Sequence, residues 1–329
     1  MASCDILVQA PQHDKFVSPK KLPTLRSNQG NHVDTASTGW MQSVTTDTPR
    51  EEMRARYEHE GYLWVKNVMP REDVLDMREH YFQQLSPTGI LLPSTSPRDG
   101  IFDPTNDPLL HQGLGGAPEQ ASLELLNTAH ATPTYRDFLT HPALRGFVRD
   151  LMNWSKEVLV DRAMLRHNCP GSLSTGIHYD KLFLRGGEAE FLTAWVPIGD
   201  CAATGGGLMY LEDSNALGEE LEAEFTRHAK TLSAEERIDA FNKHMMKDGF
   251  LSHDAEEFGR VRAGGRLRWL VGDYEAGDVV FHKPYMIHAA TKNEDELGRI
   301  RLASDLRFYE EGAALDRRWM KVWKHDDGL

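Results

Sequence analysis

Short β-type segments separated by turn residues dominate the second half of the chain, and they restrict its fold more than any other feature. These segments are rich in β-branched, aromatic and leucine side chains and are bounded by glycine, proline or charged residues. They are residues 157–167, 191–198, 208–211, 267–271, 277–281 and 300–309. Many short strands with such turns favour a closed barrel or two facing sheets. We therefore predict a mainly β fold of the α+β class with a jelly-roll core.

Helical patterns precede this region. Thr48 is a candidate N-cap and Pro49 suits the first position of a helix. A short strand that ends near Pro70 and a second helix, which continues to about residue 85, are expected to follow. Residues 141–152 and the highly charged residues 216–248 are also predicted to be helical. We expect the N-terminal helices to pack outside the β core.

The pattern also indicates how the chain is divided. Residues 1–48 are polar without a sustained period and are predicted to be a flexible N-terminal arm, with a flap or a homodimer contact as the alternative. Residues 49–329 are expected to form a single domain. Insertions at about 86–133 and 213–266 are expected to be pocket walls or a lid, because long segments between scaffold strands usually carry specificity.

Charge and cysteine content exclude several classes of protein. The net charge of −13 argues against nucleic acid and an anionic membrane as partners, because both require an excess of Lys and Arg. No run of 18 apolar residues and no apolar leader occurs, so we expect a cytoplasmic protein. Its three scattered cysteines are expected to be reduced thiols. The glycines 205–207 lack the Gly-Lys-Ser/Thr of a phosphate loop and are predicted to form a turn.

A histidine and an aspartate two positions apart form the most informative chemical motif. On an extended backbone, His178 and Asp180 leave the chain on the same side. A second histidine, His288, lies downstream. Two histidines and one carboxylate are the facial triad of non-haem Fe(II) oxygenases, which leaves three coordination positions open. With fifteen histidines in the chain, however, such a triplet also arises by chance.

Several motifs in the same order give the chain a resemblance to the phytanoyl-CoA dioxygenase family of Fe(II)/2-oxoglutarate oxygenases. They lie at 178–180, 193–200, 205–214, 276–281, 288–293 and 301–308, and the resemblance covers roughly residues 50–310. It implies a double-stranded β-helix, Fe(II), 2-oxoglutarate and O₂ as cofactor and cosubstrates, and hydroxylation of an unactivated C–H bond. It also implies that His178, Asp180 and His288 are the iron ligands and the catalytic residues.

The resemblance also points to residues for the cosubstrate. The far carboxylate of 2-oxoglutarate needs a cation, and Arg is preferred because its planar fork pairs with both oxygens. Arg299, Arg301 and Arg307 share parity on the last predicted strand and could face the same side. The family pattern favours Arg301, whereas counting from His288 favours Arg299. Trp195 matches a tryptophan near the cosubstrate, with a core aromatic as the alternative. Family members carry a small hydroxyl residue where this chain has Ala290, so we expect that hydrogen bond to the cosubstrate either to be missing or to come from Thr291.

The substrate is less defined. His167, Asn168 and Tyr179 are expected to line its pocket, and His282 to support the metal site or lie at the surface. We expect an organic small molecule, with a polyketide-type intermediate of secondary metabolism as the leading candidate from the resemblance. One alternative is an acyl-CoA substrate, whose phosphates the arginines at 260, 262, 266 and 268 would bind. Another is a metal-dependent isomerase or lyase on a cupin-like barrel. A jelly-roll core is expected to tolerate loss of the Asp180 carboxylate.

Overall fold

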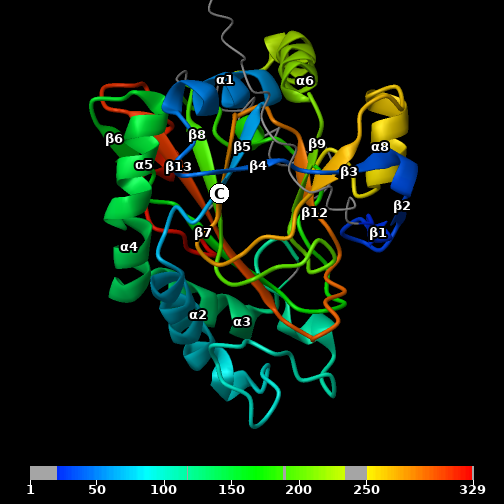
Figure 1. The fold of residues 1–329 in the computed structure, drawn as a ribbon, viewed down its shortest axis with the longest axis vertical. Coiled ribbons are helices and arrows are strands. Elements are labelled where there is room, and N and C mark those ends of the chain that lie inside the picture. Colours follow the sequence, from blue (N-terminus) through cyan, green and yellow to red (C-terminus); the bar gives the residue numbers. More distant parts are fainter. Residues whose placement is uncertain (1–20, 117, 188–189, 234–249, 328–329) are drawn as a thin grey trace, which may run out of the picture.

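Two facing β-sheets form the centre of the protein. The computed structural model describes residues 21–116, 118–187, 190–233 and 250–327. Along the larger sheet the strands are β4 (Ser43–Thr45), β5 (Tyr62–Lys66), β11 (Val279–His282), β8 (Leu192–Pro197), β13 (Arg301–Glu310) and β6 (Glu157–Leu159), and β7 (Met164–Asn168) also pairs with β13. Along the smaller sheet they are β12 (His288–Ala290), β9 (Leu208–Leu211), β10 (Trp269–Val271) and β3 (Thr38–Trp40). Figure 1 shows the two sheets facing each other around a common interior.

Aromatic side chains from both sheets fill part of this interior. Trp64 and Trp195 of the larger sheet pack against the Tyr274 ring, with centroids 5.2 and 4.8 Å away. Tyr62 stacks on Tyr210 of the smaller sheet at 5.7 Å. Two sheets joined by interdigitated inner side chains make a jelly roll. The predicted fold class, a double-stranded β-helix core with packed N-terminal helices, is confirmed.

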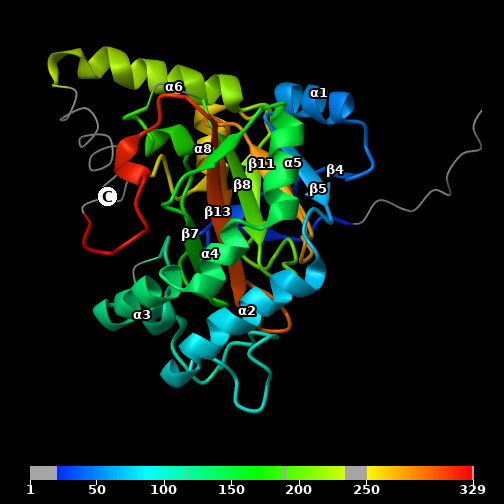
Figure 2. The same cartoon turned by 90° about the vertical axis from the view of Figure 1, so that its left-hand side faces the viewer.

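Helices cover the outer face of the larger sheet. These helices are α1 (Arg50–Glu60), α2 (Arg71–Leu85), α4 (Pro133–Leu139) and α5 (Pro142–Met152). Figure 2 shows α5, α4 and α2 in front of β8 and β13, and buried Phe147 of α5 stacks on Phe281 of β11 with centroids 5.3 Å apart. On the side of the smaller sheet lie α6 (Asn215–His228) and α8 (Ala255–Arg262). No helix in the described ranges has both the length and the apolar character needed to cross a bilayer.

The N-terminal region differs from the predicted arm. Residues 1–20 lie outside the described part of the chain, but residues 25–45 contribute the hairpin β1 (Leu25–Arg26) and β2 (His32–Val33), followed by β3 and β4. Strand β3 pairs in parallel with β10, and β4 pairs in parallel with β5. The prediction of an arm up to residue 48 is therefore wrong for this stretch. Strands of two or three residues are too short to show alternation, so tertiary pairing determines them.

Two further helical predictions need correction. Helix α1 has Pro49 as its N-cap residue, and no side chain caps it, so Thr48 does not have the predicted role. The segment 86–133, for which no helix was predicted, contains the helix α3 (Gln120–His130) and two short 3₁₀ turns, Ser86–Thr88 and Pro108–His111. Part of the predicted charged helix, residues 234–249, lies outside the described residues.

A buried arginine fixes the segment 86–133 to the barrel. Arg78 of α2 donates hydrogen bonds to the carbonyls of Arg98, Asp99, Ile198 and Ile300 at 2.8–3.0 Å. Burial lowers the pKa of this guanidinium to about 10. One side chain thus joins α2, the irregular segment, the end of β8 and the start of β13.

We expect Arg78→Met to lower the free energy of unfolding by about 3 kcal/mol or more, because several buried carbonyls lose their donor together. The matched control is Arg71→Met on the same helix. Arg71 forms an exposed pair with Asp200, so its loss should cost about 1 kcal/mol or less. Urea denaturation measures both values, and equal losses would contradict the role given to Arg78.

Candidate metal centre

Backbone pairing brings the two histidines of the motif together. The His178 N–H donates to the His288 carbonyl at 3.0 Å, and the His288 N–H donates to the His178 carbonyl at 2.9 Å. Tyr179 is extended, with φ −127° and ψ 148°, so its neighbours His178 and Asp180 point to one side. The Tyr179 ring points away from them into the core beside α6, where its hydroxyl donates to Glu222 at 2.8 Å.

The two imidazoles present the same nitrogen to Asp180. Nδ1 of His178 lies 2.8 Å from the Gly176 carbonyl, and Nδ1 of His288 lies 2.9 Å from the Met286 carbonyl. A carbonyl only accepts, so each Nδ1 carries the proton and each Nε2 keeps a free lone pair. These Nε2 atoms lie 3.8 and 3.9 Å from the Asp180 Oδ1 atom. Their convergence and tautomers fit a divalent ion held by three protein ligands.

Burial keeps both histidines neutral. It lowers the pKa of His178 to about 4, with the Asp180 charge opposing the shift. Burial, together with the neighbouring His178 and His282 rings, holds the pKa of His288 well below its usual range. A neutral imidazole is the form that binds metal, so both side chains are ready as ligands without losing a proton to solvent.

Three side chains on neighbouring strands hold the Asp180 carboxylate. Thr193 of β8 donates to Oδ2 at 2.5 Å, and His282 of β11 lies 3.3 Å from the same oxygen. Arg307 of β13 reaches Oδ1 through Nη2 at 3.0 Å and Oδ2 through Nε at 3.3 Å. Burial alone would raise the pKa of Asp180, but the Arg307 charge and the contact with His282 outweigh it and keep that pKa well below its usual range.

Arg301 and Arg299, the two candidates for the cosubstrate, have different surroundings. Arg301 is buried and lines a narrow cavity together with the triad and Trp195. Its Nε donates to the Gly206 carbonyl at 2.9 Å, and no carboxylate of the described residues forms an ion pair with it. Arg299 instead pairs with Asp295 at 2.7 Å and lines a separate cavity beside α2.

The glycines 205–207 form the predicted turn, and the middle one is required there. Gly206 has a φ of +82°, and a Cβ at this position would lie 2.6 Å from Asn168 Oδ1. The turn places the Gly206 carbonyl against Arg301. The segment therefore contributes to the cavity wall through its backbone.

The Thr291 hydroxyl contacts backbone carbonyls and not the cavity at the triad. It lies 3.2 Å from the Ala203 carbonyl and 3.4 Å from the Gly207 carbonyl, and Thr291 is not among the residues lining the cavity at the triad. Thr175 lines that cavity instead. His282 is buried against Asp180, so the surface alternative for this residue is wrong.

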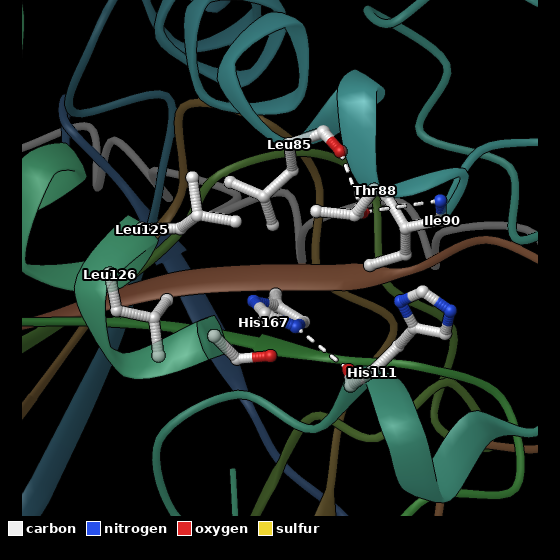
Figure 3. Close-up of a pocket in the computed structure, with 8 residues that line it drawn as sticks. Leu85, Thr88, Ile90, His111, Leu125, Leu126 and His167 are labelled. Atoms are coloured by element: carbon white, nitrogen blue, oxygen red, sulfur yellow. Dashed lines mark hydrogen bonds between the residues drawn. The ribbon is translucent and has the colours of Figure 1, made fainter. Parts of the chain in front are cut away.

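The three predicted substrate-pocket residues do not line the cavities at the triad. His167 lies in a small separate cavity, where its Nε2 contacts the His111 carbonyl at 3.0 Å and its Nδ1 contacts Tyr81 (Figure 3). Asn168 donates to the Ser172 hydroxyl at 2.9 Å, and Tyr179 points away. Alternation explains His167 and Tyr179, because their neighbours Arg166 and His178 face the cavity. Asn168 has the parity of Arg166, but its amide is bonded to Ser172 and to the Leu173 carbonyl.

A larger cavity of about 360 Å³ opens beside His178, within the usual range for small-molecule sites. Gly115 and Gly116 of the first predicted insertion and Phe250 of the second line it. Arg307 and Arg166 line both this cavity and the narrow one. Sequence analysis grouped Arg307 with Arg301 by parity only and gave Arg166 no role. Arg307 shares its parity on β13 with Arg301, and this was the available signal.

Comparison with known proteins gives a family match. The model of the family described as phytanoyl-CoA dioxygenase (PhyH) matches residues 57–300. Comparison with curated proteins gave no match.

Three solved structures are among those that match the chain at low sequence identity. The epimerase SnoN in complex with Fe³⁺, alpha ketoglutarate and nogalamycin RO is 17% identical, with 81% of this chain and 85% of that chain covered and a TM-score of 0.47. The non-heme alpha ketoglutarate dependent carbocyclase SnoK from nogalamycin biosynthesis is 17% identical, with coverage of 82% and 87% and a TM-score of 0.48. AviO1 from Streptomyces viridochromogenes Tue57 is 16% identical, with coverage of 80% and 96% and a TM-score of 0.47.

The pairing of Asp180 with Arg307 leads to a prediction that differs from the one made on sequence. In metal-free protein we expect Asp180→Ala to lower the free energy of unfolding by about 3–5 kcal/mol, because buried Arg307 loses its ion-pair partner. The double variant Asp180→Ala/Arg307→Met should recover part of this loss.

The matched control is Asp137→Ala on α4, which removes an exposed carboxylate and should change stability by about 0.5 kcal/mol or less. Urea denaturation in the presence of a chelator gives all four values. An Asp180→Ala variant as stable as the control would show that the core does not depend on this carboxylate.

Proposed function

The chain belongs to the phytanoyl-CoA dioxygenase family of non-haem iron, 2-oxoglutarate-dependent enzymes, and from that premise we propose that it oxidises a C–H bond of an organic small molecule. In the proposed reaction O₂ and 2-oxoglutarate are consumed and succinate and CO₂ are released. The observation that carries the proposal is the convergence of both Nε2 atoms on Asp180 Oδ1 in a buried site beside a cavity.

His178, Asp180 and His288 are the proposed iron ligands. When bound, Fe(II) supplies the redox chemistry that activates O₂. The protein supplies three ligands on one side and leaves the other side for 2-oxoglutarate and O₂. The backbone carbonyls of Gly176 and Met286 keep the ring orientation, and Arg307 and Thr193 keep the carboxylate in place.

Arg301 is the proposed partner of the far carboxylate of 2-oxoglutarate. It is a buried guanidinium in the cavity that contains the triad, whereas Arg299 is already paired with Asp295. A charge-assisted pair in a buried site is both strong and directional. Trp195 forms part of the same cavity wall. We assign to Thr175 the hydrogen bond to the cosubstrate that sequence analysis offered to Thr291, because Thr175 lines the cavity and Thr291 does not.

The cavity supports a small molecule better than a coenzyme A thioester. The arginines expected to bind phosphates lie on or after α8: Arg268 pairs with Glu212 at 2.6 Å, and Arg260 lines a different cavity beside β10. The cavity at His178 has three arginines in its wall, and each is paired with a carboxylate of this chain. A polyketide-type substrate remains a prediction. The isomerase or lyase alternative predicts turnover without succinate.

Anaerobic reconstitution with Fe(II) and 2-oxoglutarate tests the proposal. We expect wild-type protein to show the metal-to-ligand charge-transfer band of the bound cosubstrate, because the open side of the triad admits a chelating 2-oxo acid. His178→Ala and His288→Ala should each lose the band and retain little iron. His32→Ala, which removes an exposed histidine, is the control and should behave as wild type. Full iron occupancy in both triad variants, by metal analysis, would overturn the ligand assignment.

Arg301→Ala should weaken 2-oxoglutarate binding by roughly 10- to 150-fold, since a lost charge-assisted pair costs about 1.5–3 kcal/mol. Arg299→Ala should change it by about threefold or less, because its pair with Asp295 is partly exposed. Titration of the charge-transfer band with 2-oxoglutarate gives both dissociation constants. The reverse ranking would identify Arg299 as the cosubstrate residue.

A further inference from the structure

Two residues that line the larger cavity each have a buried hydrogen-bond donor with no acceptor among the described residues. These donors are Nη1 of Arg307 and Nε1 of Trp319. Arg307 is 3% exposed and Trp319 is 8% exposed. The other two nitrogens of the Arg307 guanidinium already contact Asp180, so Nη1 is the one that remains. A buried donor without an acceptor costs about 1–3 kcal/mol, which an oxygen atom in the cavity would offset.

The positions of these donors are fixed by their neighbours. Trp319 lies in the short turn η6 (Arg317–Trp319), and the Arg307 guanidinium lies over its ring at 5.2 Å from the centroid. Arg162 lies over the same ring at 5.5 Å and is ion-paired with Asp327. Two guanidinium groups thus lie against the indole ring, and its N–H does not need to be ordered by the molecule that it binds.

Charge in this wall favours an anion once the triad holds a divalent cation. Arg162 and Arg166 are balanced by Asp327 and Asp305. Arg307 forms its ion pair with Asp180, and the same carboxylate is the proposed metal ligand. A single carboxylate shared by a divalent cation and a guanidinium leaves positive charge in a buried site, where it interacts strongly.

Aromatic and other apolar side chains make up much of the remaining wall. Phe183 and Phe250 both pack against the His178 ring, with centroids 5.6 and 5.7 Å away, and Trp323 and Met164 also line this part of the cavity. Aromatic walls of this kind favour a planar apolar framework over a flexible chain.

We infer that this cavity recognises a flat apolar molecule that carries one anionic oxygen group, a carboxylate or an acidic enol. That group accepts hydrogen bonds from Arg307 Nη1 and Trp319 Nε1, and the apolar framework lies between Phe183, Phe250 and Trp323. The inference rests on the proposed function, because it takes the cavity beside the triad as the substrate site.

Calorimetric titration of the anaerobic protein loaded with Fe(II) and 2-oxoglutarate tests this inference. The probes are 2-naphthoate and its neutral isostere 2-naphthamide. We expect wild type to bind 2-naphthoate about tenfold more tightly than 2-naphthamide, because only the former brings a charge to Arg307.

Trp319→Phe should weaken the binding of 2-naphthoate by about fivefold and the binding of 2-naphthamide by less, because an aromatic ring remains and only the N–H donor is lost. Trp323→Phe is the matched control in the same cavity, and it should weaken both probes by the same factor. Arg307→Lys keeps a positive charge beside Asp180. It should reduce the preference for 2-naphthoate over 2-naphthamide, because a single ammonium nitrogen cannot contact Asp180 and the probe in the way that the guanidinium fork does.

The charge-transfer band distinguishes a failure of this inference from a failure of the proposed function. A normal band with no preference for 2-naphthoate, or no binding of it at millimolar concentration, overturns the inference and leaves the proposed function standing. Loss of the band on adding 2-naphthoate also overturns it, because the probe then occupies the cosubstrate position. Absence of the band in wild type before any probe is added overturns the proposed function and the inference with it.

Discussion

A buried carboxylate needs cations and donors around it, and the arrangement of this protein depends on how that need is met for Asp180. Its partners Arg307, Thr193 and His282 stand directly opposite one another on three neighbouring strands, β13, β8 and β11. The sheet register therefore sets the position of the carboxylate. A one-residue slip of any of these strands would turn its partner to the opposite face. The pairing of His178 with His288 completes the site from the smaller sheet.

Strand β13 connects this site with the core. Arg301, Asp305 and Arg307 point into the barrel and line the cavities there. Leu302, Leu306 and Phe308 point the other way into the helix-covered core. The face of β13 that points into the barrel is therefore polar, and the face that points outward is apolar. This is the reverse of the usual order for a sheet in a soluble protein. The helices α1, α2, α4 and α5 make this possible because they shield the outer face from water.

Much of this organisation could be predicted from sequence, for identifiable reasons. Strands β8, β9 and β13 are long enough to show β composition, and helix α2 is long enough to show a helical period. The spacing of His178 and Asp180 predicted a shared side because Tyr179 is extended. Strands β3 and β4 could not be predicted, because three residues carry no period and their pairing partners are more than a hundred residues away or across a helix.

The same limit applies within the site. Sequence analysis grouped Arg299, Arg301 and Arg307 by parity, but Arg299 precedes β13 and turns toward Asp295, which only the fold reveals. Thr175 and Arg166 come from separate segments that meet at the cavity through tertiary packing. His167 was misplaced because alternation on β7 gives two faces, and composition does not say which of them looks inward. The assignment of the iron ligands stays a prediction supported by their geometry.

The C-terminal segment that carries Trp319 and Trp323 lies beyond the residues matched to the family model. It is attached to the rest of the protein by the buried pair of Arg162 with Asp327 and by the contact of Asn127 with His325. The triad and the barrel are built from other parts of the chain. Substitutions in this segment can therefore change the shape of the cavity wall without replacing a triad residue. Trp319 is the exception to a clean division, because its ring lies against Arg307, which holds Asp180.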